Sequence, residues 1–371
     1  MKILICFGTR PEAIKMAPLY HKLKKNNFDV KICVTGQHRK MLDQVLDFFE
    51  IIPDFDLNLM KPNQTLNGLS AAIFKKIDLI LERECPDFVF VHGDTTTSSL
   101  VALASFHRGI KVAHIEAGLR TYNKKEPFPE ELNRQITSRI ANINFTPTKN
   151  ATQNLLSEGI KQNTIIETGN TVIDSLFWTL NKIEHNFNYP EIEELKKLIN
   201  PDKKIILITG HRRENFGIGF ENICQAILEI SKRKDVIIIY PVHLNPNVQE
   251  SVYKLLSNKK NIYLIEPISY PAFVWLMKNS FLIISDSGGI QEEAPSLGKP
   301  VLVTRNVSER GEGIIDGFSF LVGVDRSNIV AKAEMILDNF EGFENKNNPY
   351  GDGTASQKIL DYLLNLNKYV N

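Results

Sequence analysis

The sequence predicts an α/β fold in which parallel sheets are covered by helices, and three observations support this prediction. Short apolar runs of strand length alternate with segments of helix length along the whole chain. The chain has 371 residues, of which 43% are hydrophobic, so it can bury two cores and its length favours two domains. Polar residues that suit catalysis or binding follow the apolar runs directly.

The apolar runs divide into two groups. In the first half we expect strands at 2–7, 29–34, 87–91 and 111–115, with a further strand-like run at 164–167. In the second half we expect strands at 203–208, 235–240, 262–265, 281–284 and 300–303. The polar stretch 182–202 predicts a helix or linker just inside the second domain, and a loop at 345–353 precedes a terminal helix with apolar residues spaced for burial.

Composition and charge exclude several classes of protein. The net charge of +1 provides no field that would attract nucleic acid. No run of about 18 apolar residues predicts a membrane span, and Met1-Lys2 leads straight into a strand without a leader pattern, so we expect a cytoplasmic protein. The four cysteines lie far apart with no C-x-x-C, and the histidines do not show zinc spacing, so we expect neither a disulfide framework nor a metal site.

The segment from Phe281 to Glu293 is the most informative in the chain. It reads as a buried strand that runs into a turn of small residues, Ser287-Gly288-Gly289, and then into a helix start. Bare amides at such a turn can approach a phosphate, the helix dipole favours negative charge, and Glu293 follows one turn later, within reach of ribose hydroxyls. Taken alone, the segment is equally consistent with an ordinary strand-to-helix turn capped by a serine.

Other polar residues also follow strands, where the carboxyl ends of parallel strands form the ligand site of open α/β sheets. Two such sheets facing each other would bring these residues together in one cleft. The residues are Arg10, Lys15, Asp94, Glu116, His211 and His243.

Each of these residues also has a structural interpretation. Asp94 can be the N-cap of the helix that follows it, and this is its more common role. Arg10 and Lys15 can pair with Glu12 on a solvated face. Glu116 is costly to bury on a strand without a cation beside it, which favours a functional role.

Two motifs point to other chemistries that we do not expect. Tyr20 and Lys24 have the Tyr-x-x-x-Lys spacing of nicotinamide-dependent sugar epimerases, but the first strand is followed by Gly8-Thr9-Arg10-Pro11 rather than a G-x-G-x-x-G turn, so we expect no cofactor. Asp54-Phe55-Asp56 resembles a metal-binding Asp-x-Asp, but it follows Pro53 and is more typical of a solvated turn.

A set of ordered motifs gives the chain its family resemblance. They are Gly8-Thr9-Arg10-Pro11-Glu12-Ala13-Ile14-Lys15, Thr35-Gly36-Gln37-His38-Arg39, Val91-His92-Gly93-Asp94-Thr95, His114-Ile115-Glu116-Ala117-Gly118-Leu119-Arg120, Pro129-Glu130-Glu131-Leu132-Asn133-Arg134, Thr209-Gly210-His211-Arg212-Arg213-Glu214-Asn215, Pro241-Val242-His243-Leu244-Asn245-Pro246 and Ser285 to Pro300. With these motifs, which span nearly the whole chain, the sequence resembles the non-hydrolysing UDP-N-acetylglucosamine 2-epimerases.

The resemblance implies a glycosyltransferase-B-like architecture of two Rossmann-like domains with parallel sheets facing across a deep cleft. The first domain would comprise residues 1–168 plus 355–371, the C-terminal helix crossing back to it, and the second would comprise 169–354. It also implies a homodimer. The implied reaction is the reversible conversion of UDP-GlcNAc to UDP-ManNAc, through elimination of UDP to a 2-acetamidoglucal and re-addition, for surface polysaccharide synthesis.

The resemblance also implies roles for individual residues. The catalytic group would be Asp94, Glu116, Glu130 and His211. The UDP-sugar would be held by Arg10, Lys15, His243, Phe273, Ser287, Gly288, Gly289, Glu293 and Arg310.

Three positions depart from the family pattern. Asn63 stands where bacterial relatives with an activating second UDP-GlcNAc site carry arginine, which weakens any diphosphate contact there and leaves Gln37, Gln44 and His211 as the candidates for that site. Ile268 replaces a glutamine that touches the nucleotide in some members. Gly311 replaces a common proline after Arg310.

Three other functions remain open. A hydrolysing epimerase would release free ManNAc and UDP, and an epimerase for a modified UDP-2-acetamido sugar would share the UDP site but differ in the sugar pocket. A non-catalytic UDP-sugar sensor would bind without turnover. The residues do not identify which carboxylate is the acid and which is the base.

Overall fold

The computed structural model describes residues 1–36, 39–61, 63–186, 189–343 and 346–368 and divides into two compact units. The first unit comprises Met1–Ser175 and Tyr350–Asn371, and the second comprises Leu176–Pro349. The chain therefore passes from one unit to the other after Ser175 and returns before Tyr350, where the sequence had led us to expect changes after 168 and before 355.

The first unit is built on a seven-stranded parallel sheet with the strand order β3-β2-β1-β4-β5-β6-β7. The strands are β1 Lys2–Phe7, β2 Asp29–Val34, β3 Phe55–Asp56, β4 Phe88–His92, β5 Lys111–Ile115, β6 Ile143–Thr146 and β7 Ile165–Glu167. The order reverses between β1 and β4, which is the topological switch point of a Rossmann-like sheet.

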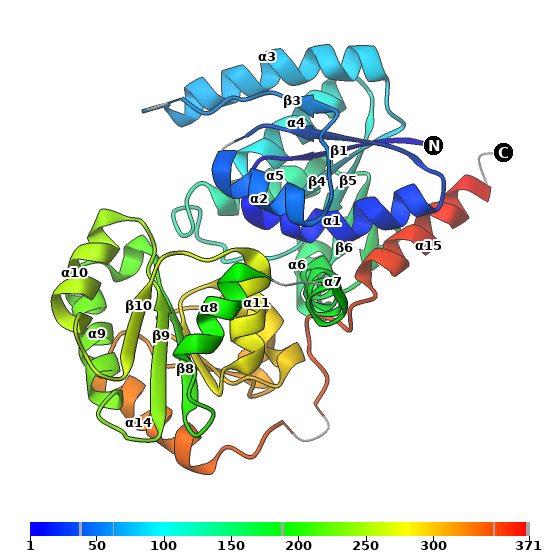
Figure 1. Ribbon diagram of the computed structural model, residues 1–371. Helices are drawn as coiled ribbons and strands as arrows, with labels where there is room; N and C mark the ends of the chain where they lie inside the picture. The colour runs from blue at the N-terminus through cyan, green and yellow to red at the C-terminus, as the bar shows by residue number, and fades with distance from the viewer. Residues whose placement is uncertain (37–38, 62, 187–188, 344–345, 369–371) are drawn as a thin grey trace. The chain divides into compact units, whose positions relative to one another are not determined.

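Helices cover both faces of this sheet. They are α1 Arg10–Lys25, α2 Arg39–Phe48, α3 Leu66–Glu84, α4 Thr96–His107, α5 Glu130–Ile140, α6 Lys149–Ser157 and the C-terminal α15 Ala355–Lys368, with a 3₁₀ turn at Gln162–Thr164. Helices α3, α4 and α5 pack side by side, and α1 packs against α2 and α15, as Figure 1 shows. The central strand β1 is apolar and fully buried from Ile3 to Phe7, as required of a strand covered on both faces.

The C-terminal helix is fixed to the first unit at its start and along one face. Asp174 accepts hydrogen bonds from the backbone amides of Ala355 at 3.1 Å and Ser356 at 2.8 Å, which satisfies amides that the first turn of a helix leaves unpaired. Ile359 and Leu363 on the same helix are completely buried. The predicted burial of the terminal helix is therefore confirmed, and the helix belongs to the first unit (Figure 1).

The second unit repeats the same topology with six parallel strands in the order β10-β9-β8-β11-β12-β13. They are β8 Lys204–Thr209, β9 Val236–Pro241, β10 Ile262–Ile265, β11 Leu282–Ser285, β12 Val301–Val303 and β13 Ser319–Leu321. Its switch point lies between β8 and β11.

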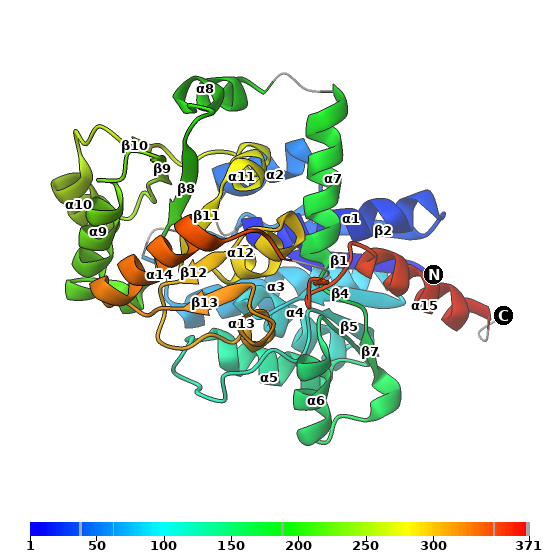
Figure 2. The same cartoon turned by 90° about the horizontal axis from the view of Figure 1, so that it is seen from below.

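The helices of the second unit also lie on both faces of its sheet. They are α8 Pro190–Leu198, α9 Ile218–Ile230, α10 Pro246–Leu256, α11 Tyr270–Asn279, α12 Gly288–Glu293, α13 Gly311–Ile315 and α14 Arg326–Asn339, with 3₁₀ turns at Arg213–Asn215 and Ala294–Leu297. Helix α7 Thr171–Asn186 begins in the first unit and continues into the second. Figure 2 shows α9, α10 and α14 together on one side of the sheet and α11 and α12 on the other.

The α/β fold with two parallel sheets is confirmed. None of the described helices has the length and apolar character needed to cross a membrane. One local expectation is only partly correct: Asp54 and Asp56 are exposed, as predicted, but the segment is not a turn. Phe55–Asp56 forms the edge strand β3 beside β2, and the Asp54 carboxylate accepts a hydrogen bond from the amide of Ile32 at 2.8 Å, which fixes the start of that strand.

Candidate active site

The turn after β1 is held by a buried carboxylate. Thr9 is the N-cap of α1, and Glu12 accepts hydrogen bonds from the amides of Gly8 at 3.0 Å and Thr9 at 2.9 Å. The other oxygen of Glu12 accepts from the hydroxyls of Thr95 and Ser98 at 2.8 and 3.1 Å. Glu12 is therefore not on a solvated face beside Arg10 and Lys15; it is buried and joins the turn after β1 to the start of α4.

Asp94 follows β4 at the switch point of the first sheet. The N-cap of α4 is the next residue, Thr95, whose hydroxyl accepts from the amide of Ser98 at 3.1 Å. The N-cap interpretation of Asp94 is therefore wrong, and its carboxylate pairs instead with Arg134 on α5. Arg134 Nε and Nη2 donate to Asp94 Oδ2 at 3.0 and 2.8 Å, and Asn133 Nδ2 donates to the Asp94 backbone oxygen at 2.9 Å.

Glu116 ends β5 and adopts a left-handed backbone conformation, with φ +61°. Such a conformation is uncommon for a residue with a side chain, and it recurs at functional sites. The carboxylate is nearly buried, forms an ion pair with Lys15 Nζ and accepts from Asn170 Nδ2 at 2.7 Å. Sequence reasoning found Lys15 and Glu116 separately, and the structure shows them in contact.

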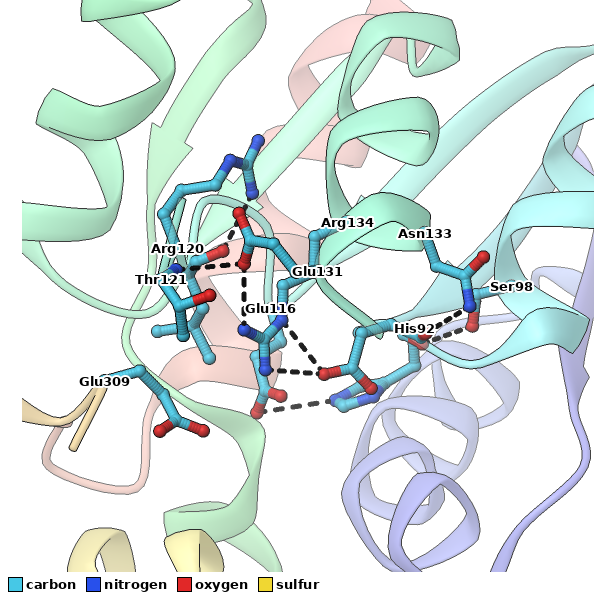
Figure 3. A network of polar contacts seen from close by, with 12 residues as sticks. His92, Ser98, Glu116, Arg120, Thr121, Glu131, Asn133, Arg134 and Glu309 are labelled. Carbon is cyan, nitrogen blue, oxygen red and sulfur yellow. Dashed lines mark hydrogen bonds and ion pairs between the residues drawn. The ribbon is translucent and has the colours of Figure 1, made fainter. Parts of the chain in front are cut away.

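Two buried histidines lie on the neighbouring strands β4 and β5. His92 Nε2 is 3.8 Å from Glu116 Oε2 and has no hydrogen-bond partner among the described residues (Figure 3). His114 Nε2 bonds to the carbonyl oxygen of Gly93 at 2.7 Å, and its Nδ1 lies 3.4 Å from the Ser138 hydroxyl. Burial lowers the pKa of each histidine to about 4, so both imidazoles are neutral at pH 7.

Glu130 and Glu131 both lie in the first turn of α5, but they have different environments. Glu131 is completely buried, whereas Glu130 is half-buried and lines a cavity of about 450 Å³. Asp94 lines the same cavity, together with Thr9, Met60, Lys61 and the stretch from Asn63 to Leu66. The structure therefore brings two of the predicted acid–base carboxylates, Asp94 and Glu130, to one cavity.

In the second unit, a buried aspartate organises the loop after β8. Asp286 is completely buried and accepts from the backbone amides of His211 and Arg212, each at 3.0 Å. His211 is half-exposed and stacks on His243, with ring centroids 5.2 Å apart. The structure thus brings two predicted residues from different strand ends into contact. Asp286 lies between the predicted strand and the predicted turn, but sequence reasoning gave it no role.

The turn after β11 has one feature that differs from the prediction. The amide of Ser287 is not bare, because it donates to Ser285 Oγ at 3.0 Å. The amides of Gly288 and Gly289 open α12, where N–H groups have no acceptor within the helix. A Cβ placed on Gly288 would lie 2.5 Å from Cζ of Arg310, so only glycine lets the guanidinium lie over this turn.

Arg310 and Glu293 are each held by neighbouring side chains. Arg310 Nε donates to Glu292 Oε1 at 3.0 Å, and Nη1 pairs with Glu309. Although burial opposes it, the positive charges of Arg310 and Arg305 hold the pKa of Glu309 well below its usual range. Glu293 accepts from the Tyr270 hydroxyl at 2.7 Å.

The remaining predicted residues are placed as follows. Arg10 is the first residue of α1, directly after the turn held by Glu12, and Phe273 is half-buried in the first turn of α11, the helix that carries Tyr270. Of the candidates for a second nucleotide-sugar site, Gln44 is exposed on α2, and Gln37 lies outside the described residues.

The fold is of the Rossmann type in both units, with carboxylates at the switch point of the first sheet and a turn of small residues that opens a helix at the switch point of the second. The family model described as UDP-N-acetylglucosamine 2-epimerase matches residues 21–364. The chain therefore belongs to the UDP-N-acetylglucosamine 2-epimerase family, and the predicted resemblance is confirmed.

Individual relatives agree with this assignment. The chain is 52% identical over 374 residues to a UDP-N-acetylglucosamine 2-epimerase of Campylobacter jejuni. The alignment covers 98% of this chain and 97% of the relative. It is 50% identical over 378 residues to the enzyme of that name from Escherichia coli K12, covering 98% and 99%. The crystal structure of UDP-GlcNAc 2-epimerase from Neisseria meningitidis bound to UDP-GlcNAc is similar, with a TM-score of 0.94 and 49% identity over 98% of this chain and 100% of that one.

Proposed function

We propose that this protein interconverts UDP-N-acetylglucosamine and UDP-N-acetylmannosamine by inverting C2 of the sugar. The observation that carries the proposal is that residues suited to this reaction lie at the switch point of each of the two sheets. Asp94 and the turn before Arg10 lie at that of the first sheet, and His211 and the Ser287 turn lie at that of the second. Membership of the epimerase family supports the same function.

The chemical difficulty is that the C2 hydrogen is not adjacent to a carbonyl and is only feebly acidic. We propose that the C1–O bond to UDP breaks, its electron pair leaving on the diphosphate oxygen, while a carboxylate removes the C2 proton and a C1–C2 double bond forms. The product pair is UDP and a 2-acetamidoglucal. Delivery of a proton to the other face of C2 and re-addition of the diphosphate oxygen at C1 complete the inversion.

Asp94, Glu116 and Glu130 are the acid–base groups in this proposal. Asp94 and Glu130 line one cavity, and Glu116 has its charge balanced by Lys15. Groups of this kind contribute on the order of 10²–10⁴-fold to turnover when they transfer a proton. His211, stacked on His243, assists at the diphosphate or at a hydroxyl.

The second unit supplies the groups that hold and stabilise the leaving diphosphate. The first-turn amides of α12 at Gly288 and Gly289 and the guanidinium of Arg310 over the same turn match the needs of an oxyanion that gains charge as the bond breaks. Glu293, with one oxygen bonded to Tyr270, is the proposed partner of the ribose hydroxyls. Arg10, His243 and Phe273 complete the proposed UDP-sugar contacts.

The proposal also includes a homodimer in the cytoplasm. The reduced cysteines, of which Cys6, Cys33 and Cys224 are buried, suit a reducing compartment. Light scattering would test the dimer, with an expected mass near twice 42.2 kDa. Cell fractionation would test the location.

The function is tested by incubating the purified protein with UDP-GlcNAc and separating nucleotide-linked sugars from free sugars by chromatography. We expect UDP-ManNAc to appear with no free ManNAc and no net loss of nucleotide sugar. Free ManNAc with UDP would instead identify a hydrolysing epimerase. Saturable binding without any product would identify a sensor.

A further inference from the structure

The side chain of Arg134 on α5 joins two carboxylates of the first unit. Two of its nitrogens, Nε and Nη2, donate to Asp94 Oδ2 at 3.0 and 2.8 Å, and the third, Nη1, donates to Glu131 Oε2 at 3.3 Å. Arg134 is 4% exposed and Glu131 is completely buried. Figure 3 shows this guanidinium beside Glu131, with Glu116 and His92 close by.

Glu131 is fully occupied by the protein itself. Its Oε2 accepts the amide of Thr121 at 2.9 Å in addition to Arg134, and its Oε1 accepts the amide of Tyr122 at 3.1 Å and the side chain of Gln135 at 2.9 Å. A carboxylate offers about four acceptor positions, and here four donors use them. Glu131 is therefore anchored to the backbone of the loop after β5, and it can hold Arg134 in one place.

Arg134 in turn fixes Asp94 through one oxygen only. Both of its hydrogen bonds to this carboxylate go to Oδ2, and no donor among the described residues reaches Oδ1. Asp94 is part of the cavity lining, and Asn133 holds its backbone oxygen from the neighbouring position of α5. This arrangement sets the rotation of the carboxylate through Oδ2.

We propose that Arg134 is a positioning residue for Asp94 in the reaction, and that Glu131 orients Arg134. The inference rests on the proposed function, in which Asp94 transfers a proton at C2. A guanidinium gives two parallel donors in a rigid plane, which the single ammonium of lysine does not reproduce. Because displacements of about 1 Å can cost on the order of 10²-fold in rate, loss of this contact acts mainly on kcat.

The test is the Arg134→Ala variant, assayed with and without added guanidinium ion. We expect kcat to fall on the order of 10²-fold, with affinity for UDP, measured by calorimetry, unchanged within about two-fold. Millimolar guanidinium chloride, below denaturing concentrations, is expected to raise the kcat of this variant about ten-fold or more. The ion can occupy the space of the missing side chain and donate hydrogen bonds to Asp94.

Arg120 provides a matched control in the same unit. It is also buried and forms a two-point pair, with Glu158 at 2.7 and 3.0 Å. The Arg120→Ala variant is expected to lose thermal stability as Arg134→Ala does, but to keep kcat within a few-fold, with no response to guanidinium. Equal effects of the two variants on kcat would show that Arg134 is merely structural and would overturn the proposal.

If Arg134→Ala does not fold, two further variants test whether Arg134 positions Asp94. Arg134→Lys and Glu131→Gln keep most of the side-chain volume, and each is expected to lower kcat at least about ten-fold while KM changes less than kcat. Turnover by both within two-fold of the unchanged protein would refute the positioning role. Absence of turnover by the unchanged protein would instead refute the proposed function, so the two failures are distinguishable.

Discussion

At the residue scale, the carboxylates of the first unit differ in what balances their charge. Asp94 is paired with Arg134, and Glu116 is paired with Lys15 and also bonded to Asn170. A buried carboxylate without such partners would be costly to ionise. Each of these two carboxylates therefore has its own cationic partner.

The pair of Lys15 and Glu116 can be tested with a double-mutant cycle. We expect Lys15→Met and Glu116→Gln each to lower kcat on the order of 10²–10³-fold, since each removes or misplaces the same carboxylate. The double variant should lose little more than the worse single one, because residues that act as a unit are not additive. Additive losses in steady-state kinetics would mean that Lys15 acts on the substrate by itself.

Replacing Gly288 with alanine is expected to leave the fold intact but to weaken the binding of UDP. The added Cβ would lie 2.5 Å from Cζ of Arg310, and a flexible side chain can move away, but only by leaving Glu292 and Glu309. We expect Gly288→Ala to weaken UDP binding about ten-fold or more in calorimetry. Gly311→Ala is the control, because nothing lies within 4 Å of its added Cβ. Similar UDP affinity in both variants would mean that the position of the Arg310 guanidinium over this turn does not contribute to UDP binding.

At the element scale, the loop after β5 depends on close packing against α6. Gly118 has φ +91°, and a Cβ there would lie 2.3 Å from the backbone oxygen of Ala151. Backbone cannot move aside as a side chain can, so Gly118→Ala is expected to cost about 3 kcal/mol or more of stability. Gly109→Ala, with φ +68° and nothing within 4 Å, should cost only about 1–2 kcal/mol. Thermal unfolding of the two variants compares them directly, and equal losses would refute the contact.

Much of the fold at this scale was predictable from sequence, because the central strands are continuous apolar runs. Strands β1, β2, β5 and β10 begin and end at the predicted residues. Three strands were not predicted, because none of them has an apolar run long enough to be recognised from sequence. Strand β3 has two residues, β13 has three, and β6 carries the polar residues Asn144 and Thr146.

The contacts of the site were less predictable than its residues. Strand ends identified Asp94, Glu116 and His211, but Arg134 lies 40 residues from Asp94, and Lys15 lies 101 residues from Glu116. Such pairs depend on which helix packs beside which strand, and local sequence does not encode that. The role of Asp286 was not predicted, because it accepts hydrogen bonds from the backbone amides of His211 and Arg212, and backbone amides do not appear in side-chain motifs.

At the scale of the whole molecule, buried histidines make stability depend on pH. Burial lowers the pKa of His92 and His114 to about 4, below the value near 6.5 of the unfolded chain. Between these values the unfolded chain binds protons that the folded protein does not, so stability is present above pH 6.5 and is lost as pH falls toward 4. From pH 7 to pH 5 the loss is about 2 kcal/mol for each histidine.

The variant His114→Gln isolates one of these contributions, since its amide can still donate to Gly93. Glu12 has the opposite effect on stability: burial raises its pKa, so its contribution to stability increases as pH falls. Comparing the variant with the unchanged protein separates the contribution of His114 from that of Glu12. Thermal unfolding at pH 7 and pH 5 should show a smaller loss for the variant than for the unchanged protein. Equal losses would mean that His114 is already protonated in the fold.

We propose that the C2 proton leaves the sugar and is replaced from solvent-exchangeable groups of the first unit. Proton NMR of the purified protein with UDP-GlcNAc in deuterated water tests it in one measurement, since product, nucleotide linkage and exchange at C2 appear together. We expect UDP-ManNAc with deuterium at C2, followed by deuterium at C2 of the remaining UDP-GlcNAc as the reaction reverses. Product that retains its original C2 hydrogen would contradict the mechanism.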